Sequence, residues 1–336
     1  MLKEVAENVD VISHSRFLHL DLERNYVDNS GSRARKRQDR IDSHATLKKR
    51  LTSFLYARYY NGSFTFRSSN QSVPRFIFGY DPKLVYALDQ ANNGQGYFEK
   101  GWCVTDSDGA DYLTVNNGKI TLRICRALHL SPSQQQAQVG DVVAIRWPSG
   151  RPFASPGFYL ATSDFPFDSE SSNIARLYFN IQIQSADSLM RAMTTVLNQA
   201  PIGFRFKICS NPHNYARWDV AVLYFDHDDF MLVRDKAVAI YKNLQASFNP
   251  QVPAFTKLLA PGLALAEEPP QTTEQLESFG EHRCRLLAEG LLNAFEKSCR
   301  DPIGKLKLMI ERFHEEGLNL DYPYLNPGNK DIYHWD

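Results

Sequence analysis

Four basic residues in the second half of the sequence have a spacing that could let them bind an anion together. Arg176, Arg205, Lys207 and Arg217 fall on or beside neighbouring predicted strands, where a period of two residues can bring side chains to one face. Guanidinium groups make bidentate, charge-assisted contacts with phosphate. Positive neighbours also disfavour the charged form of a lysine, which makes Lys207 the candidate general base. A solvated sheet face is the alternative interpretation of the same spacing.

A second candidate anion site begins at Ser278, in the segment SFGEHRCR. Ser278 and Glu281 have the S-x-x-E spacing of a capping box, which predicts a helix that begins near Phe279. Backbone N–H groups at a helix start can bind anions, so His282 and Arg283 would lie at the rim of such a site. An ordinary capped core helix is the alternative interpretation.

Two histidines are candidates for general acid catalysis, because imidazole exchanges protons near neutral pH. His282 is the first choice, at the start of the predicted helix. His213, in a predicted loop close to Arg217, is the second choice. The remaining histidines show no metal-ligand spacing, and the sequence contains no HExxH motif. We therefore expect no metal.

Several enzyme classes lack their motifs in this sequence. There is no GxSxG nucleophile, no glycine-rich kinase loop with its strand lysine, and no HRD or DFG motif. The acidic run at Asp226, Asp228 and Asp229 lacks EF-hand spacing and favours a helix start, where carboxylates suit the helix dipole. A serine hydrolase, a kinase and an EF-hand site are therefore excluded as interpretations.

Two predicted strands carry most of the candidate residues. In the segment ARLYFNIQIQ, residues 175–184, the aliphatic and phenylalanine side chains point one way and form a core face. The opposite, available face carries Arg176, Tyr178 and Asn180. The segment FRFKIC alternates in the same way and presents Arg205 and Lys207 outward.

Other elements follow from the same periodicities and from turn residues. An Asn-Asn-Gly turn between two alternating runs predicts a β-hairpin. Predicted strands lie at 111–115, 119–126, 142–147, 157–162 and 218–225, and predicted helices at 51–60, 82–91, 187–198 and 229–244. Together they predict an α+β fold, with a mixed or antiparallel sheet covered by helices and a helical and hairpin N-terminal portion.

Composition limits the partners that this chain can attract. The 336 residues are 43% hydrophobic, and 38 basic residues balance 38 acidic ones, so any anion site must be local. Nucleic acid and membrane surfaces are therefore not expected as partners. The N-terminus lacks the apolar run of a signal peptide, no later stretch resembles a membrane span, and the cysteines show no metal spacing. We expect a cytoplasmic protein with reduced cysteines.

Three regions are expected along the chain. Residues 1–50 form a variable basic N-terminal segment, residues 51–130 an N-terminal helix and hairpin region, and residues 131–336 a C-terminal α+β region that carries the site. The basic segment is either a peptide-docking arm or a solvated helix face. Its basic residues are Arg33, Arg35, Lys36, Arg37, Arg40, Lys48, Lys49 and Arg50.

A set of segments that occur in one order gives the sequence a family resemblance. They are LYARYY, ANNGQGYFEKGW, GFYLATSD, RLYFNI, FRFK running to YARWDVAVLYF, LLAPGLALAE, ESFGEHRCRLLAEGL and YPYLNPG. From about Leu51 to Tyr333 the chain resembles the HopA-type type III effector family, which includes plant-pathogen effectors and many other bacterial proteins. The first 50 residues lie outside the resemblance.

The resemblance implies a chemistry. HopA-like members of class V lanthipeptide and thioamitide pathways are lyases that work beside an aminoglycoside-phosphotransferase-like kinase. It therefore implies that this chain eliminates phosphate from phosphoserine or phosphothreonine of a precursor peptide, giving dehydroalanine or dehydrobutyrine, with such a kinase as partner. Effector members imply the alternatives, which are an interaction protein acting on host proteins and a non-catalytic peptide- or partner-binding protein.

Phosphate elimination assigns a role to each candidate residue. Lys207 would take the Cα proton, and His282 would protonate the departing phosphate. Tyr178 and Asn180 would orient the peptide or stabilise its enolate-like charge. The phosphate would be bound by Arg176, Arg205, Arg217 and Arg283. No cofactor is needed, because phosphate is a good leaving group once cations balance its charge.

Overall fold

The main body of the molecule is built on a seven-stranded antiparallel sheet. The computed structural model describes residues 1–20, 38–64, 79–168, 173–271 and 277–335. The strand order is β12-β13-β9-β11-β10-β8-β7, and every neighbouring pair is antiparallel. The strands are β7 (Gly150–Ser155), β8 (Phe158–Thr162), β9 (Ile174–Phe179), β10 (Phe204–Cys209), β11 (Ala221–Asp226), β12 (Lys257–Ala260) and β13 (Leu263–Glu267). This sheet confirms the expected α+β class.

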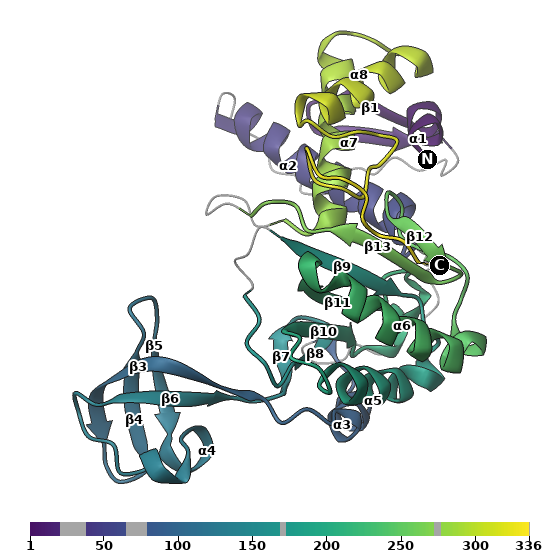
Figure 1. Cartoon of the computed structure of the whole chain (residues 1–336). Helices are drawn as coiled ribbons and strands as arrows, with labels where there is room; N and C mark the ends of the chain where they lie inside the picture. Colours follow the sequence, from purple (N-terminus) through teal and green to yellow (C-terminus); the bar gives the residue numbers. More distant parts are fainter. Residues whose placement is uncertain (21–37, 65–78, 169–172, 272–276, 336) are drawn as a thin grey trace.

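One face of this sheet forms the core beneath three helices. Phe204, Phe206 and Ile208 alternate along β10 and are all fully buried. The helices α3 (Pro82–Ala91), α5 (Ala186–Leu197) and α6 (Phe230–Leu244) lie together on this side (Figure 1). The regular alternation of β10 predicted its core face from the sequence.

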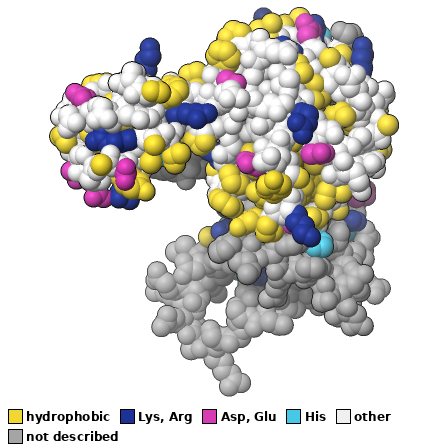
Figure 2. Space-filling view, turned by 90° about the horizontal axis from the view of Figure 1, so that it is seen from below, with side chains coloured by type: hydrophobic (Ala, Val, Ile, Leu, Met, Phe, Trp, Pro, Cys, Tyr) yellow, Lys and Arg dark blue, Asp and Glu magenta, His cyan; other side chains and the backbone are white. Residues whose placement is uncertain are grey.

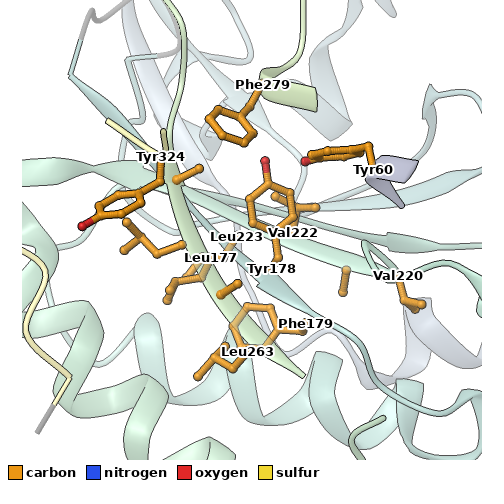
Figure 3. Packing of buried hydrophobic residues seen from close by; sticks show 14 of the residues in the cluster. Tyr60, Leu177, Tyr178, Phe179, Val220, Val222, Leu223, Leu263, Phe279 and Tyr324 are labelled. Atoms are coloured by element: carbon orange, nitrogen blue, oxygen red, sulfur yellow. The ribbon is translucent and has the colours of Figure 1, made fainter. Parts of the chain in front are cut away.

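Helices and aromatic side chains cover part of the opposite face. The helix α2 (Gln38–Leu55) continues into a π-helical turn, η2 (Tyr56–Tyr60), and packs against α7 (Phe279–Glu296). Tyr178 points from the sheet toward Tyr60 and Phe279, away from Phe179 and Leu263 (Figure 3). All six residues of β9 are buried. The face of β9 that was expected to be available is therefore closed, because residues distant in sequence pack over it.

The predicted strand at 175–184 is also shorter than expected. β9 ends at Phe179, and a 3-10 turn, η5 (Ile183–Ser185), leads into α5. The other 3-10 turns are η4 (Pro132–Gln134), η6 (Pro212–Ala216), η7 (His227–Asp229) and η8 (Gln245–Ser247).

The N-terminal residues pack beside the last helix. They form α1 (Leu2–Asn8) and the hairpin β1 (Val9–Ser13) and β2 (Arg16–His19), and α1 contacts α8 (Pro302–Glu315). Lys305 on α8 is buried and donates to the Asp10 carboxylate over 2.8 Å. The basic residues Arg33, Arg35, Lys36 and Arg37 lie outside the described residues.

A four-stranded sheet forms a separate lobe, residues 97–147, which we call the β-lobe (Figure 1). Its strands are β3 (Tyr97–Asp108), β4 (Tyr112–Asn116), β5 (Thr121–Cys125) and β6 (Val142–Trp147), with a short helix α4 (Arg126–His129). Trp102, Leu113 and Ile145 belong to its own hydrophobic core. The hairpin predicted around residues 116–118 is confirmed as β4 and β5. Residue 131, the expected start of the C-terminal region, lies inside this lobe.

In the described parts of the chain, no helix combines the length and the apolar character that crossing a bilayer requires.

The first prediction separates the two faces of β10. We expect Phe206→Ala to lower the free energy of unfolding by about 3–5 kcal/mol, because the ring is fully buried and its loss leaves a cavity. Lys207→Ala should cost about 1 kcal/mol or less, since that side chain is only half-buried. Chemical denaturation of both variants measures the difference. Equal losses of stability would contradict the assignment of the faces.

Candidate active site

The pairing register places the basic residues of β10 and the polar residues of β9 on one face of the main sheet. Arg205 on β10 lies opposite Tyr224 on β11, which in turn lies opposite Arg176 on β9. The next row on that face runs from Lys207 across β11 to Tyr178. Because side chains alternate along each strand, both rows point to the same side of the sheet. The expected shared face is confirmed for Arg176, Tyr178, Arg205 and Lys207, whereas Asn180 lies beyond the end of β9.

Lys207 lies on the part of this face that α7 and η2 leave open. Its side chain is half-buried, and its Nζ is 4.8 Å from the centroid of the Phe158 ring and 5.3 Å from that of Tyr224. These distances allow cation–π contacts. No carboxylate forms an ion pair with Lys207 within the described part of the chain. The amine therefore lies between two aromatic rings, without a carboxylate in ion-pair contact among the described residues.

Two arginines lie beside Lys207 and also lack an acidic partner among the described residues. Arg151 on β7 lies opposite Leu160 on β8, which lies opposite Lys207, so it belongs to the same face. Burial, and then the charge of Arg151, hold the pKa of Arg205 below its usual value. We call Arg151, Arg205, Lys207, Phe158 and Tyr224 the sheet-face site.

Arg151 was not among the residues that the sequence indicated. Its strand, β7, begins with Gly150 and contains Pro152, and both residue types argue against a strand in a sequence pattern. The Arg151 guanidinium lies 4.6 Å from the centroid of the Trp147 ring, and burial raises the pKa of the nearby Tyr97 although the charge of Arg151 lowers it. The only signal in the sequence is its place in the short segment between two strands that were predicted.

Arg176 and Arg217 are on or beside this face, but each is already paired with a carboxylate. Arg176 is buried in an ion pair with Glu268. Arg217 binds Asp219 through two contacts, of 2.6 Å from Nε and 2.7 Å from Nη2. Burial raises the pKa of Asp219, but the charge and hydrogen bonds of Arg217 outweigh burial and hold that pKa below its usual value. Both arginines are therefore committed to the scaffold.

Tyr178 and Asn180 are buried by contacts within the protein. The Tyr178 side chain points toward Tyr60 (Figure 3), and burial is the main reason that the pKa of Tyr178 rises to about 12. The Asn180 side chain donates to the carbonyl of Gln251 over 2.9 Å and accepts from Asn249 over 3.2 Å. Neither side chain is open to a peptide in this arrangement.

The capping box predicted at Ser278 is present, but the start of α7 faces aromatic rings. The Ser278 hydroxyl accepts from the Glu281 N–H, and the Glu281 carboxylate accepts from the Ser278 N–H. Gly280 is buried, and a Cβ at this position would collide with the rings of Tyr56 and Tyr60. The glycine therefore permits tyrosine packing where an anion had been expected.

Arg283 uses its guanidinium to hold the C-terminal segment. It is fully buried and donates to the carbonyls of Pro323, over 3.0 Å, and Leu325, over 3.1 Å. Its third contact, of 2.8 Å, is from Nη1 to Nδ1 of His282. Burial lowers the pKa of Arg283 to about 10. This side chain ties α7 to the segment YPYLNPG rather than facing the sheet-face site.

His282 lies at a separate cavity, which we call the α7 cavity. Burial, followed by the charges of Arg283 and Arg285, lowers the pKa of His282 to about 3. The imidazole is therefore neutral near pH 7. The cavity measures about 270 Å³, and its lining includes Pro269, Glu277, His282, Arg283, Arg285 and Asn326 but no member of the sheet-face site.

The second-choice histidine and the acidic run lie elsewhere. His213 is exposed on η6, just before Arg217. Asp226, His227 and Asp228 bring three possible metal-ligand atoms within 4.8 Å of one another at the turn that precedes α6. The Asp226 carboxylate accepts from the N–H of Asp228 over 3.0 Å, as expected for residues that start a helix.

Comparisons with known proteins identify one family. The model of the HopA1 effector protein family matches residues 149–325, which is more than half of the chain. An effector protein structure from Pseudomonas syringae pv. tomato strain DC3000 is 17% identical, with 85% of this chain and 97% of that chain covered and a TM-score of 0.43. A second, from Pseudomonas syringae pv. syringae strain 61, is 15% identical, with 84% and 97% covered and a TM-score of 0.42. No curated protein matches the sequence.

The second prediction follows from the lowered pKa of His282. An unfolded histidine binds a proton below about pH 6.5, whereas the folded imidazole resists protonation down to about pH 3. Stability should therefore be present above pH 6.5 and fall as the pH decreases toward 3. We expect His282→Gln to remove about 1–2 kcal/mol of the loss between pH 7 and pH 5.

Urea denaturation at both pH values measures this difference. His334→Gln, which changes an exposed histidine in the C-terminal segment, is the matched control. An unchanged pH dependence in the His282 variant would contradict the assignment of a buried neutral imidazole.

Proposed function

This chain belongs to the HopA1 effector protein family, and we propose that it eliminates phosphate from phosphoserine or phosphothreonine in a peptide. One observation carries the proposal. Lys207 is half-buried between two aromatic rings and lies beside Arg151 and Arg205, and none of these three cations has a carboxylate partner among the described residues. A phosphorylated serine or threonine would supply the negative charge that these cations lack, and its Cα–H group is weakly acidic.

The elimination needs a base for the Cα proton and positive groups that stabilise the negative charge on the departing phosphate. The step requires Lys207 in its unprotonated form. Its amine takes the Cα proton, the electrons of that C–H bond form the Cα=Cβ double bond, and the Cβ–O bond breaks. Phosphate departs with the electron pair of that bond, and the product is dehydroalanine or dehydrobutyrine. Arg151 and Arg205 balance the charge that grows on the phosphate, which is the point at which fixed cations help most.

Tyr224 completes the assignment of roles at the sheet-face site. Lys207 and Arg176 both contact its ring, the latter at 4.8 Å from the centroid. Its hydroxyl has no hydrogen-bond partner among the described residues, and in this scheme it donates a hydrogen bond to the enolate-like oxygen of the peptide. His282 has no part in this scheme, because a neutral imidazole at a separate cavity cannot protonate the phosphate.

A second candidate function is non-catalytic binding of a phosphorylated partner. The absence of a charged imidazole from the described part of the sheet-face site favours it, because binding needs the cations but no acid. An effector that binds phosphorylated host proteins and a protein that holds a peptide for a partner both belong to this class. In the lyase proposal, an aminoglycoside-phosphotransferase-like kinase would supply the phosphopeptide.

Mass spectrometry of synthetic phosphopeptides separates these functions. Elimination gives a dehydro residue, hydrolysis by a phosphatase would restore the serine or threonine, and binding alone would leave the peptide unchanged. Added thiol should then react with the dehydro residue and give a second, predictable mass. A phosphopeptide that stays intact through prolonged incubation with the full chain, across varied peptide sequences, would contradict the lyase proposal.

The third prediction assigns the base. Lys207→Ala should slow elimination by about 10²–10⁴-fold while phosphopeptide binding survives, because the amine acts on Cα–H and not on the phosphate. Lys207→Arg should not restore turnover, since a guanidinium stays protonated. Lys307→Ala, at a lysine whose side chain is 77% exposed on α8, is the matched control. Full activity in Lys207→Ala would rule out this base.

The fourth prediction assigns the phosphate contacts. Arg205→Ala and Arg151→Ala should each weaken phosphopeptide binding and slow turnover together, because the phosphate gains charge as the bond breaks. Titration of a labelled phosphopeptide and of its unphosphorylated form measures binding in both variants. The unphosphorylated peptide should bind all proteins equally weakly. Unchanged affinity for the phosphopeptide in both arginine variants would remove the site.

A further inference from the structure

An apolar groove lies on the hairpin that carries part of the sheet-face site. It measures about 470 Å³ and is lined by Tyr80, Pro152, Phe153, Ser155, Pro156 and Gly157. Phe153 is 69% exposed, although its ring packs 5.1 Å, centroid to centroid, from that of Tyr80. Exposed phenylalanine in a hollow of this kind is typical of a surface that binds another apolar group.

The groove and the sheet-face site are continuous along the chain. Residues 152–157 form the groove, and Arg151 precedes them while Phe158 follows them. Phe158 is the ring against which the Lys207 amine lies. A molecule that reached from the cations to the groove would therefore cross only the β7–β8 hairpin.

The register gives the approximate length of that reach. Ser155 in the groove lies opposite Phe158, whereas Lys207 and Arg151 lie opposite Leu160. Phe158 and Leu160 are one same-face step apart on β8, which is about 7 Å. The far side of the groove adds about one more such step. An extended peptide covers this distance in two to four residues.

We propose that the groove binds an apolar side chain of the same phosphopeptide, two to four residues from the phosphorylated one. This inference rests on the proposed function. Arg151 and Arg205, which have no carboxylate partner among the described residues, select an anionic ligand, and the apolar groove beside them selects a hydrophobic group on the same molecule. An extended peptide joins these two groups at the required distance.

Two further observations favour a peptide as the occupant. β7 is the last strand of its sheet, so one edge of it has no strand partner among the described residues, and extended peptides bind along such edges. Hydrophobic side chains also gather on the underside of the main body, with basic residues at the border of the patch (Figure 2). The helix α3 lies at this end of the molecule (Figure 1).

The experiment measures the binding of phosphothreonine peptides to the full chain by fluorescence anisotropy. Each peptide has a serine and glycine background and one leucine, which is moved from four residues before the phosphothreonine to four residues after it. We expect the tightest binding with leucine two to four residues away, on one side. Every protein in these titrations also carries Lys207→Ala, because elimination would otherwise convert the phosphopeptide during the measurement.

Phe153→Ser tests the groove itself. It should weaken binding of the best leucine peptide about 5–10-fold and leave the peptide without leucine unaffected. Ile303→Ser, at a residue that is 81% exposed on α8, is the matched control and should change neither affinity. Equal melting temperatures show that both variants are folded.

The outcomes separate this inference from the proposed function. A leucine preference that persists in Phe153→Ser, or that peaks next to the phosphothreonine, would overturn the groove even if wild-type protein eliminates phosphate. A leucine preference that depends on Phe153 in a protein that never eliminates phosphate would uphold the groove and overturn the lyase. No leucine preference at any position would overturn the groove alone.

Discussion

The buried ion pair between Arg217 and Asp219 holds together the two layers on which the sheet-face site depends. Asp219 accepts two hydrogen bonds from Arg217 and a third, of 3.0 Å, from the Tyr56 hydroxyl. This contact fixes the π-helical turn η2 against the sheet, and Tyr60 in the same turn then reaches Tyr178. Removal of one partner from such a pair leaves a buried charge uncompensated, which is far more costly than loss of both.

The same pair determines where the open part of the sheet begins. The Arg217 guanidinium lies 5.3 Å from the centroid of the Phe158 ring, and the Lys207 amine lies 4.8 Å from it. The Phe158 ring therefore contacts one cation that is paired with a carboxylate, Arg217, and one that has no such pair among the described residues, Lys207. The carboxylates of Asp219 and Glu268 are already bound by Arg217 and Arg176, so they leave the positive charge of Lys207, Arg205 and Arg151 for a ligand. A chain with no net charge can therefore attract an anion locally, where basic side chains outnumber the carboxylates available to pair with them.

Local patterns predicted the strands and the shared face, but not what covers that face. Alternation along β9 and β10 was sufficient to predict one face for Arg176 and Arg205, because the period of a strand follows from short-range sequence. Coverage of Tyr178 depends on Tyr60 and Phe279, which are more than a hundred residues away from it in the chain. The role of Arg283 was equally hidden, since its acceptors are backbone carbonyls that any residue could supply.

Arg151 is a member of the sheet-face site that the sequence patterns did not predict, although its side chain lies at a junction of three parts of the structure. Tyr97 and Trp147, the first and last residues of the β-lobe strands, hold its guanidinium from one side. Its chain neighbours Pro152 and Phe153 line the apolar groove on the other side. Arg151 therefore lies where the β-lobe, the groove and the main sheet meet. A displacement of the β-lobe would move the two rings that position this cation, so the position of Arg151 in the sheet-face site depends on a lobe that contributes no residue to that site.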